Sequence, residues 1–103
     1  MSDRPIGIQR ADPDDAIALE ALMDPYVEQG LVLRRTAREI REAIGDFLVA
    51  RDDDRIVGTV SLRNYGNGLQ EVRSLVVDAE VARQGIGSRL VTEAVEMAQR
   101  RGA

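Results

Sequence analysis

The 103-residue chain contains no cysteine, no histidine and no lysine, so all 14 of its basic residues are arginine. Without cysteine there is no disulfide framework, no thiolate metal site and no thiol nucleophile. The absence of histidine removes the commonest general base and the commonest metal ligand, and we expect no metal cofactor. Carboxylates, hydroxyls and backbone groups are left to carry any chemistry.

Long apolar runs and excess positive charge are also lacking. No apolar segment approaches the length that spans a membrane, and the N-terminal stretch MSDRPIG has no apolar signal core, so we expect a cytoplasmic protein. The net charge of −4 disfavours a general affinity for nucleic acid or for anionic membranes. The apolar content of 44% and the length predict one small folded domain.

The first half of the chain is predicted to form a strand and two helices. Ile6–Arg10 alternates apolar and polar residues, which is typical of a short strand. The stretch ADPDD starts a helix that we expect to end near Pro25, because the residue before a proline disfavours helical backbone. A capping box from Thr36 to Glu39 starts a second helix, which we expect Gly45 to end.

The second half is predicted to form a three-stranded meander and a helix. Strands are expected over Phe47–Arg51, Arg55–Tyr65 and Glu71–Val77, joined by an aspartate turn and a Gly-Asn-Gly turn. From Ile86 onward, apolar residues at helical spacing predict a helix that closes at Gly102. The order strand, helix, helix, three antiparallel strands, helix predicts an α/β domain with a mainly antiparallel sheet.

The segment VARQGIGSRL, between the last strand and the last helix, places two glycines where a helix must begin. Unpaired N–H groups of residues 84–88 lie at the positive end of the helix dipole, and Gly85 and Gly87 allow an anion to approach them. Arg83 and Arg89 can add charged contacts. The pattern matches neither the Walker sequence nor the dinucleotide fingerprint, so a phosphate-binding turn and a turn without a ligand both remain possible.

The segment from Glu71 to Ala103 resembles motif A of the GNAT acyltransferase superfamily, in which a strand and a loop lead into Arg/Gln-x-x-Gly-x-Gly/Ala. Gly85 and Gly87 match the two glycines, whereas Ala82 stands at the initial Arg/Gln position. The order of elements from Ile6 to Arg100 also resembles that of the family. The resemblance implies a GNAT-like fold and acetyl-CoA as the acyl donor.

The resemblance also implies roles for particular residues. In the family the pyrophosphate lies on the amides that correspond to Arg83–Ser88, and the pantetheine arm pairs with the fourth strand like an extra strand. A catalytic glutamate often occupies the place of Glu71, although a solvent-facing glutamate at a strand end is the alternative. The N–H of Val76 or Val77 is the implied oxyanion donor. The implied cofactor-binding residues are Leu75, Val76, Val77, Arg83, Gln84, Gly85, Ile86, Gly87 and Ser88.

A second resemblance, to the acetyltransferase domain of N-acetylglutamate synthases, implies an amino-acid acceptor. Glutamate, the acceptor of arginine biosynthesis, is the one it favours. Arg34 or Arg35 can clamp a carboxylate with the guanidinium fork, or both can be solvated residues before the second helix. The matching residues are Pro25, Val27, Gly30, Leu33, Arg34, Arg35 and Asp46, Phe47, Leu48, Val49.

The family usually continues with a fifth strand, another helix and a closing hairpin. We therefore expect residues 1–103 to be the N-terminal portion of a single GNAT-like acetyltransferase domain, truncated after the motif-A helix. Two hypotheses remain open. The first is an N-acetyltransferase acting on a small amino acid, and the second is a non-catalytic module that binds a partner chain, or binds CoA without turnover. We also expect a homodimer or strand exchange across the open edge of the fourth strand.

Overall fold

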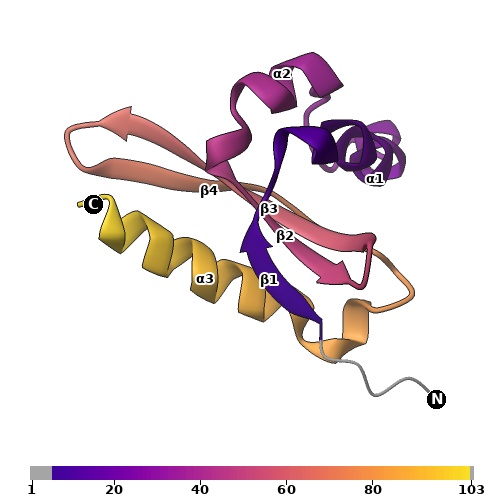
Figure 1. Cartoon of the computed structure of the whole chain (residues 1–103). Coiled ribbons are helices and arrows are strands. Elements are labelled where there is room, and N and C mark those ends of the chain that lie inside the picture. Colours follow the sequence, from indigo (N-terminus) through magenta and orange to yellow (C-terminus); the bar gives the residue numbers. More distant parts are fainter. Residues whose placement is uncertain (1–5, 103) are drawn as a thin grey trace.

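A four-stranded antiparallel sheet separates two helical layers, with α1 and α2 on one face and α3 on the other (Figure 1). The computed structural model describes residues 6–102, except for the side chain of Arg83. The elements, with η marking 3-10 helices, are β1 (Gly7–Arg10), η1 (Pro13–Asp15), α1 (Ala16–Glu28), α2 (Ala37–Glu42), η2 (Ile44–Asp46), β2 (Phe47–Asp52), β3 (Arg55–Gly66), β4 (Leu69–Val77), η3 (Ala82–Gln84) and α3 (Ile86–Arg100).

The strands lie in the order β1-β2-β3-β4, and each pairs antiparallel with its neighbour. Hairpin turns connect β2 to β3 and β3 to β4, with Asp53 and Asn67 in left-handed backbone conformations at their tips. Within residues 6–102, β1 and β4 form the two edges of the sheet. The predicted element order and the mainly antiparallel sheet are confirmed.

The alternation of side chains along β2 divides the core into two clusters. Phe47 and Val49 face α1 and α2, whereas Leu48 and Ala50 face α3, because successive strand residues point to opposite faces. The cluster under α1 and α2 contains Ala11, Ala16, Leu19, Met23, Ile40, Phe47, Val49 and Val76. The cluster over α3 contains Ile6, Leu48, Ala50, Val57, Val60, Leu62, Ile86, Leu90, Ala94 and Met97.

Gly58 on β3 sets how deeply α3 packs on the sheet. A Cβ at this position would lie 3.1 Å from Leu90 Cδ1 and 3.3 Å from the Val76 carbonyl oxygen. Both distances are tighter than ordinary contact, so glycine allows the helix and strand to approach each other. This approach brings the first turn of α3 next to the end of β4.

The structure corrects two predicted helix boundaries. α1 does not end near Pro25 but continues to Glu28. The proline removes one helical hydrogen bond, and the following Tyr26 offsets that loss by packing against the core and bonding to Val77. α2 ends at Glu42, and Gly45 lies in η2 without a left-handed conformation, so it is not the helix cap.

The predicted capping box at the start of α2 is confirmed. The Glu39 N–H donates to Thr36 Oγ1 at 3.1 Å, and the Thr36 N–H donates to Glu39 Oε1 at 3.0 Å. Hydrogen bonds from the Thr36 backbone and side chain lower the pKa of the Glu39 carboxyl. Within residues 6–102, no helix is both long enough and apolar enough to cross a membrane.

Candidate functional site

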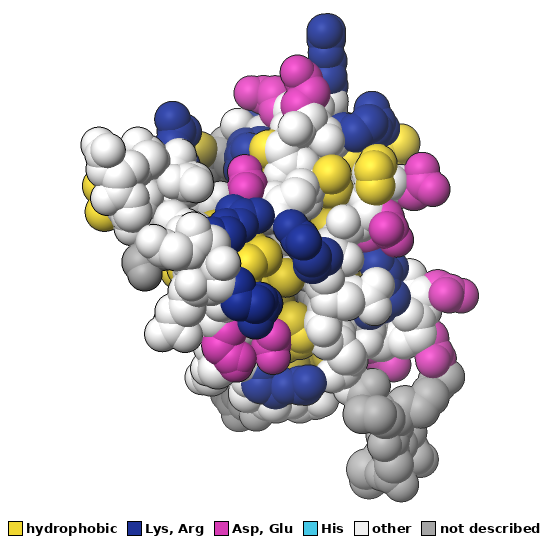
Figure 2. Space-filling model, turned by 60° about the vertical axis from the view of Figure 1, so that its left-hand side comes forward, with side chains coloured by type: hydrophobic (Ala, Val, Ile, Leu, Met, Phe, Trp, Pro, Cys, Tyr) yellow, Lys and Arg dark blue, Asp and Glu magenta, His cyan; other side chains and the backbone are white. Residues whose placement is uncertain are grey.

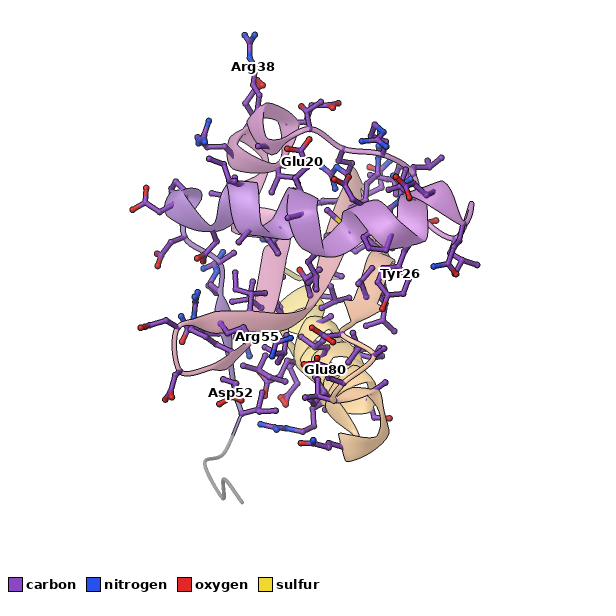
Figure 3. The ribbon with its side chains drawn as sticks, turned by 90° about the vertical axis from the view of Figure 1, so that its right-hand side faces the viewer. Glu20, Tyr26, Arg38, Asp52, Arg55 and Glu80 are labelled. Atoms are coloured by element: carbon purple, nitrogen blue, oxygen red, sulfur yellow. The ribbon has the colours of Figure 1, made fainter. Side chains whose placement is uncertain are left out.

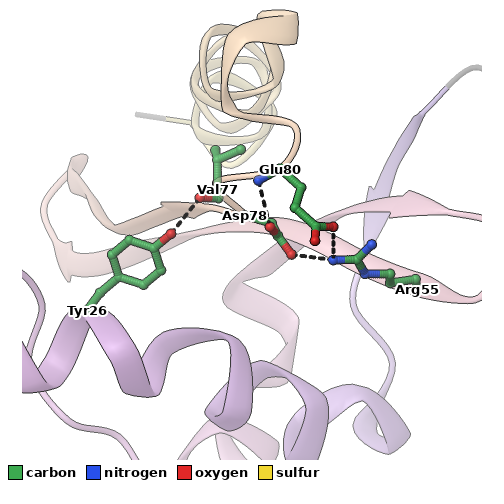
Figure 4. Close-up of polar contacts among 5 residues, drawn as sticks. All are labelled: Tyr26, Arg55, Val77, Asp78 and Glu80. Atoms are coloured by element: carbon green, nitrogen blue, oxygen red, sulfur yellow. Dashed lines mark hydrogen bonds and ion pairs between the residues drawn. The ribbon is translucent and has the colours of Figure 1, made fainter.

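The backbone of Val77 faces the open edge of the sheet. Asp78 N–H donates to the Val57 carbonyl at 2.8 Å, and Val77 lies opposite Gly58. Because bonded and non-bonded pairs alternate in an antiparallel ladder, the N–H and C=O of Val77 point away from β3. The Tyr26 hydroxyl, arriving from α1, donates to this carbonyl at 2.9 Å (Figure 4).

A β-bulge divides β4 into two parts. Thr59 pairs with Val76, but Ser61 pairs with Arg73, so two residues of β4 lie opposite one residue of β3. The bulge includes Ser74, whose φ of 52° is left-handed. Such a bulge bends the strand and increases its twist, so the two ends of β4 face different surroundings.

The turn before α3 has the backbone geometry of an anion-binding site. Gly85 has a φ of 75°, a conformation that favours glycine. The Arg89 N–H donates to the Gly85 carbonyl at 3.1 Å as the first bond of the helix. The N–H groups of Ile86, Gly87 and Ser88 therefore have no acceptor within the helix. The sequence predicted that the Gln84 N–H would also be unpaired. The structure corrects this, because that N–H donates to the Val81 carbonyl at 3.1 Å in η3.

Gly87 lies beside the end of β4. A Cβ at Gly87 would lie 3.7 Å from Val77 Cγ2, which is an ordinary van der Waals distance. Internal packing therefore does not require glycine at this position. Its effect is to leave bare backbone at the helix start, directly beside the open strand end.

The loop from β4 to η3 is held by a cluster of charged side chains. Arg55 Nη2 lies 2.6 Å from Asp78 Oδ2 and 3.0 Å from Glu80 Oε2, and Glu80 N–H donates to Asp78 Oδ1 at 2.9 Å (Figure 4). Hydrogen bonding to Glu80 and the charge of Asp78 raise the pKa of Arg55. Figure 3 shows Arg55 and Glu80 close together below α1 and Tyr26. The loop that leads to the turn is thereby fixed to β3.

Arg83 and Arg89 were both predicted to add charged contacts to an anion at the turn. Arg89 Nη2 donates to the Ile6 carbonyl at 2.7 Å, so this guanidinium is bound to the chain segment that precedes β1. The predicted contact of Arg83 with an anion lies outside the described residues, because its side chain is not described. Among the described groups, the N–H groups of Ile86, Gly87 and Ser88 are therefore the main candidates for contact with an anion.

A groove of about 690 Å³ lies at the other end of β4, between the α1–α2 connection and the β3–β4 hairpin. It brings Arg34, Arg35 and Glu71 together from distant parts of the sequence. Figure 2 shows arginine side chains bordering an apolar hollow on this face. The charged residues lining it are Arg34, Arg35, Glu39, Asp46, Arg63, Glu71 and Arg73.

Arg35 and its neighbour Arg34 differ in their partners. The guanidinium carbon of Arg35 lies 4.9 Å from the centre of the buried Phe47 ring. Burial, and then the charge of Arg73, lower the pKa of Arg35. Among the described residues, no hydrogen bond or ion pair reaches Arg35. Arg34, by contrast, is 3.3 Å from Asp24 Oδ1 and is more than half exposed.

Glu71 lies on the groove wall, opposite Arg63 in the β3–β4 register. Its Oε1 is 3.2 Å from Arg73 Nε and 3.4 Å from the Tyr65 hydroxyl, and 53% of the side chain is exposed. Five residues of β4 separate Glu71 from Val77, which is at most about 20 Å of strand. The groove and the glycine turn are thus at opposite ends of one strand.

The remaining predicted contact residues on β4 differ in burial. The Leu75 side chain is exposed, Val77 is half-buried, and Val76 is buried under α1. Val76 lies opposite Thr59 as a bonded pair of the ladder, so its N–H and C=O point toward β3, and of the two valines only Val77 turns its backbone to the open edge. Sequence reasoning did not identify Tyr26, Arg63 or Arg73. The alternation of Glu71 and Arg73, which places both on one strand face, was the only available signal.

The fold and the sequence place the chain in a known family. The chain belongs to the acetyltransferase (GNAT) family, whose sequence model matches residues 15–103. An uncharacterized N-acetyltransferase of Chlorobaculum tepidum is 34% identical over 87 residues, covering 84% of this chain and 56% of the relative. An amino-acid acetyltransferase of Mycobacterium tuberculosis is 29% identical over 99 residues, covering 93% and 56% respectively. The chain thus spans little more than half the length of these curated relatives.

Solved structures confirm the expected GNAT-like fold. An N-acetylglutamate synthase of Neisseria gonorrhoeae, complexed with coenzyme A and N-acetyl-glutamate, superposes with a TM-score of 0.91 at 24% identity. That match covers 98% of this chain and 24% of the synthase. A Mycobacterium tuberculosis protein complexed with CoA superposes with a TM-score of 0.84 at 28% identity, covering 91% and 58%.

Proposed function

We propose that this protein is an acetyl-CoA-dependent N-acetyltransferase whose acceptor is the amine of a small amino acid, with glutamate favoured. The observation that carries the acceptor class is the environment of Arg35. A half-buried guanidinium that stacks on Phe47 in an open groove, near Glu39 and Asp46 but in no ion pair among the described residues, is suited to bind a carboxylate. The curated relatives named amino-acid acetyltransferases support the same class.

Acetyl-CoA is proposed to bind at the C-terminal end of β4. The outward N–H groups at the start of α3 provide donors for the pyrophosphate of acetyl-CoA, and residues 83–88 form its turn. The open edge at Leu75–Val77 provides backbone groups for the amides of the pantetheine arm. Solved relatives complexed with coenzyme A support this assignment.

The chemistry proposed for Glu71 is proton removal from the acceptor ammonium through intervening water molecules, because Glu71 lies six positions before Val77 on β4. The amine must be neutral to attack the thioester carbon, and a carboxylate is the general base that this histidine-free chain offers. Arg35 holds the acceptor carboxylate meanwhile. Of the two implied oxyanion donors, the Val76 N–H points toward β3, and the Val77 N–H at the open edge is the one that can meet the acetyl-CoA arm.

The open edge of β4 is proposed to pair with a second copy of the chain or to exchange strands with it. Leu69, Val72 and Leu75 are exposed along this strand, and an uncovered edge presents unpaired backbone groups. We further propose that residues 1–103 form the N-terminal portion of a longer acetyltransferase domain. A dimer in light scattering is the expected result, and a monomer at high concentration contradicts the pairing.

Calorimetric titration of acetyl-CoA into the protein tests the function, with Gly87→Val as the comparison. Valine adds branched bulk beside Val77, where the bare backbone otherwise receives the ligand. We expect the wild type to bind and the variant to lose most of its affinity while keeping its circular dichroism spectrum. Absence of binding by the folded wild type contradicts the proposal. Binding without acetylation of any amino acid supports a non-catalytic module instead.

A further inference from the structure

Tyr26 connects two distant parts of the chain at the open edge of β4. Its ring packs against the core cluster beneath α1, and its hydroxyl reaches the Val77 carbonyl, 51 positions further along the chain. Figure 4 shows Tyr26 and Arg55 on opposite sides of the strand end, with Val77 and Asp78 between them. The end of β4 is therefore fixed from both sides.

The hydrogen-bonding capacity of the phenol limits what else can bind there. A tyrosine hydroxyl has one proton, and Tyr26 donates it to the Val77 carbonyl. Toward any further group the same oxygen can only accept. Tyr26 thus supplies the Val77 carbonyl with the hydrogen bond that a neighbouring strand would supply. The edge-facing N–H of Val77 remains as the donor for an incoming group.

An arm containing amides matches this arrangement. Its carbonyl can accept from Val77 N–H, and its N–H can donate to the Tyr26 oxygen or to the second lone pair of the Val77 carbonyl. Because Tyr26 belongs to α1, it also fixes the distance between that helix and the strand edge. The arm then meets groups that are already aligned, which reduces the entropy lost on binding.

We propose that Tyr26 is a positioning residue for the pantetheine arm of acetyl-CoA, acting through the Val77 backbone. The proposal rests on the proposed function, which supplies the cofactor. It assigns Tyr26 no proton transfer and no contact with the reacting carbonyl. Its consequence is selective: loss of the hydroxyl weakens ligands that carry the arm and spares ligands that occupy only the glycine turn.

The test compares two ligands on Tyr26→Phe, which keeps the ring and its packing. Acetyl-CoA carries the arm, whereas adenosine 3′-phosphate 5′-diphosphate carries the nucleotide and the pyrophosphate without it. By calorimetry we expect acetyl-CoA to bind the variant about fivefold more weakly, in the range of one hydrogen bond. The affinity for adenosine 3′-phosphate 5′-diphosphate is expected to stay unchanged. Tyr65→Phe, which removes the other phenol of the chain, is the matched control and should change neither affinity.

Each other outcome counts against a definite claim. Equal weakening of both ligands by Tyr26→Phe, with a lowered thermal midpoint, shows a merely structural role and overturns the proposal. Unchanged affinity for acetyl-CoA overturns it as well, while leaving the proposed function intact. A folded wild-type protein that binds neither ligand overturns the proposed function together with the role of Tyr26.

Discussion

The two ends of β4 are built in different ways. At its C-terminal end, the groups facing outward are backbone groups: the edge of Val77 and the N–H groups of the turn before α3. At its N-terminal end, a groove is lined by charged side chains that come from three separate segments. The first arrangement suits a ligand part that is constant, such as a pyrophosphate or an amide arm, and the second suits an acceptor that varies between enzymes.

The bulge at Ser74 lies between these two ends. A continuous, regular strand would present one uniform edge along its length. The extra residue instead bends β4, so that the groove and the open edge are separated by a break in the ladder. Substitutions at either end should therefore affect one ligand and spare the other.

The largest expected effect is on turnover, from Glu71→Gln at the groove end. If Glu71 is the base, its amide analogue lowers kcat about 100-fold, within the range of general-base catalysis. The affinity for acetyl-CoA should not change, because about 20 Å of strand lies between Glu71 and Val77. Steady-state kinetics and calorimetry measure the two quantities. Unchanged kcat removes Glu71 from the mechanism.

A smaller effect is expected from Arg35→Met, which keeps an apolar side chain over Phe47 but removes the charge. The KM for the amino-acid acceptor should rise about 30-fold, as expected for the loss of a charge-assisted pair. The KM for acetyl-CoA should stay constant.

Arg34→Met is the matched control for that substitution, because Arg34 already pairs with Asp24 at an exposed site. It should leave the acceptor KM nearly unchanged. Thermal unfolding gives a second readout: L-glutamate should raise the midpoint of the wild type and of Arg34→Met, but not that of Arg35→Met. Equal loss in both variants would mean that the two arginines act only through the general positive charge of the groove.

Much of the C-terminal end of β4 and of the turn before α3 could be predicted from sequence, because local patterns encode local backbone conformation. The left-handed Gly85 follows from such a pattern, as does the Thr36–Glu39 capping box on the groove side. The continuation of α1 through Pro25 could not be predicted in this way. It depends on the packing and hydrogen bond of Tyr26, whose partner lies 51 residues away.

The groove at the N-terminal end of β4 was predicted only in part, because it too depends on residues that are distant in the sequence. Sequence similarity pointed to Arg34 and Arg35 as a pair, but only tertiary structure distinguishes them: one pairs with Asp24 and the other stacks on Phe47. Burial and then the charge of Arg73 lower the pKa of Arg35, and no sequence spacing indicates that these two arginines share a groove. The tertiary structure decides which charged side chains lie close together, and local periodicity does not predict it.

The smallest expected effect comes from Arg55→Ala, which releases the loop before the turn without touching the turn itself. Arg55 bridges Asp78 and Glu80, and its side chain is 55% exposed, so water and salt screen the pair. We expect acetyl-CoA affinity to fall about threefold at low salt, because exposed pairs contribute little. This difference should shrink in 0.5 M salt, whereas the acceptor KM stays constant. Arg38→Ala is the control, since its Glu42 pair lies on α2, away from the turn. A salt-independent loss with Arg55→Ala would show that Arg55 acts through packing rather than charge.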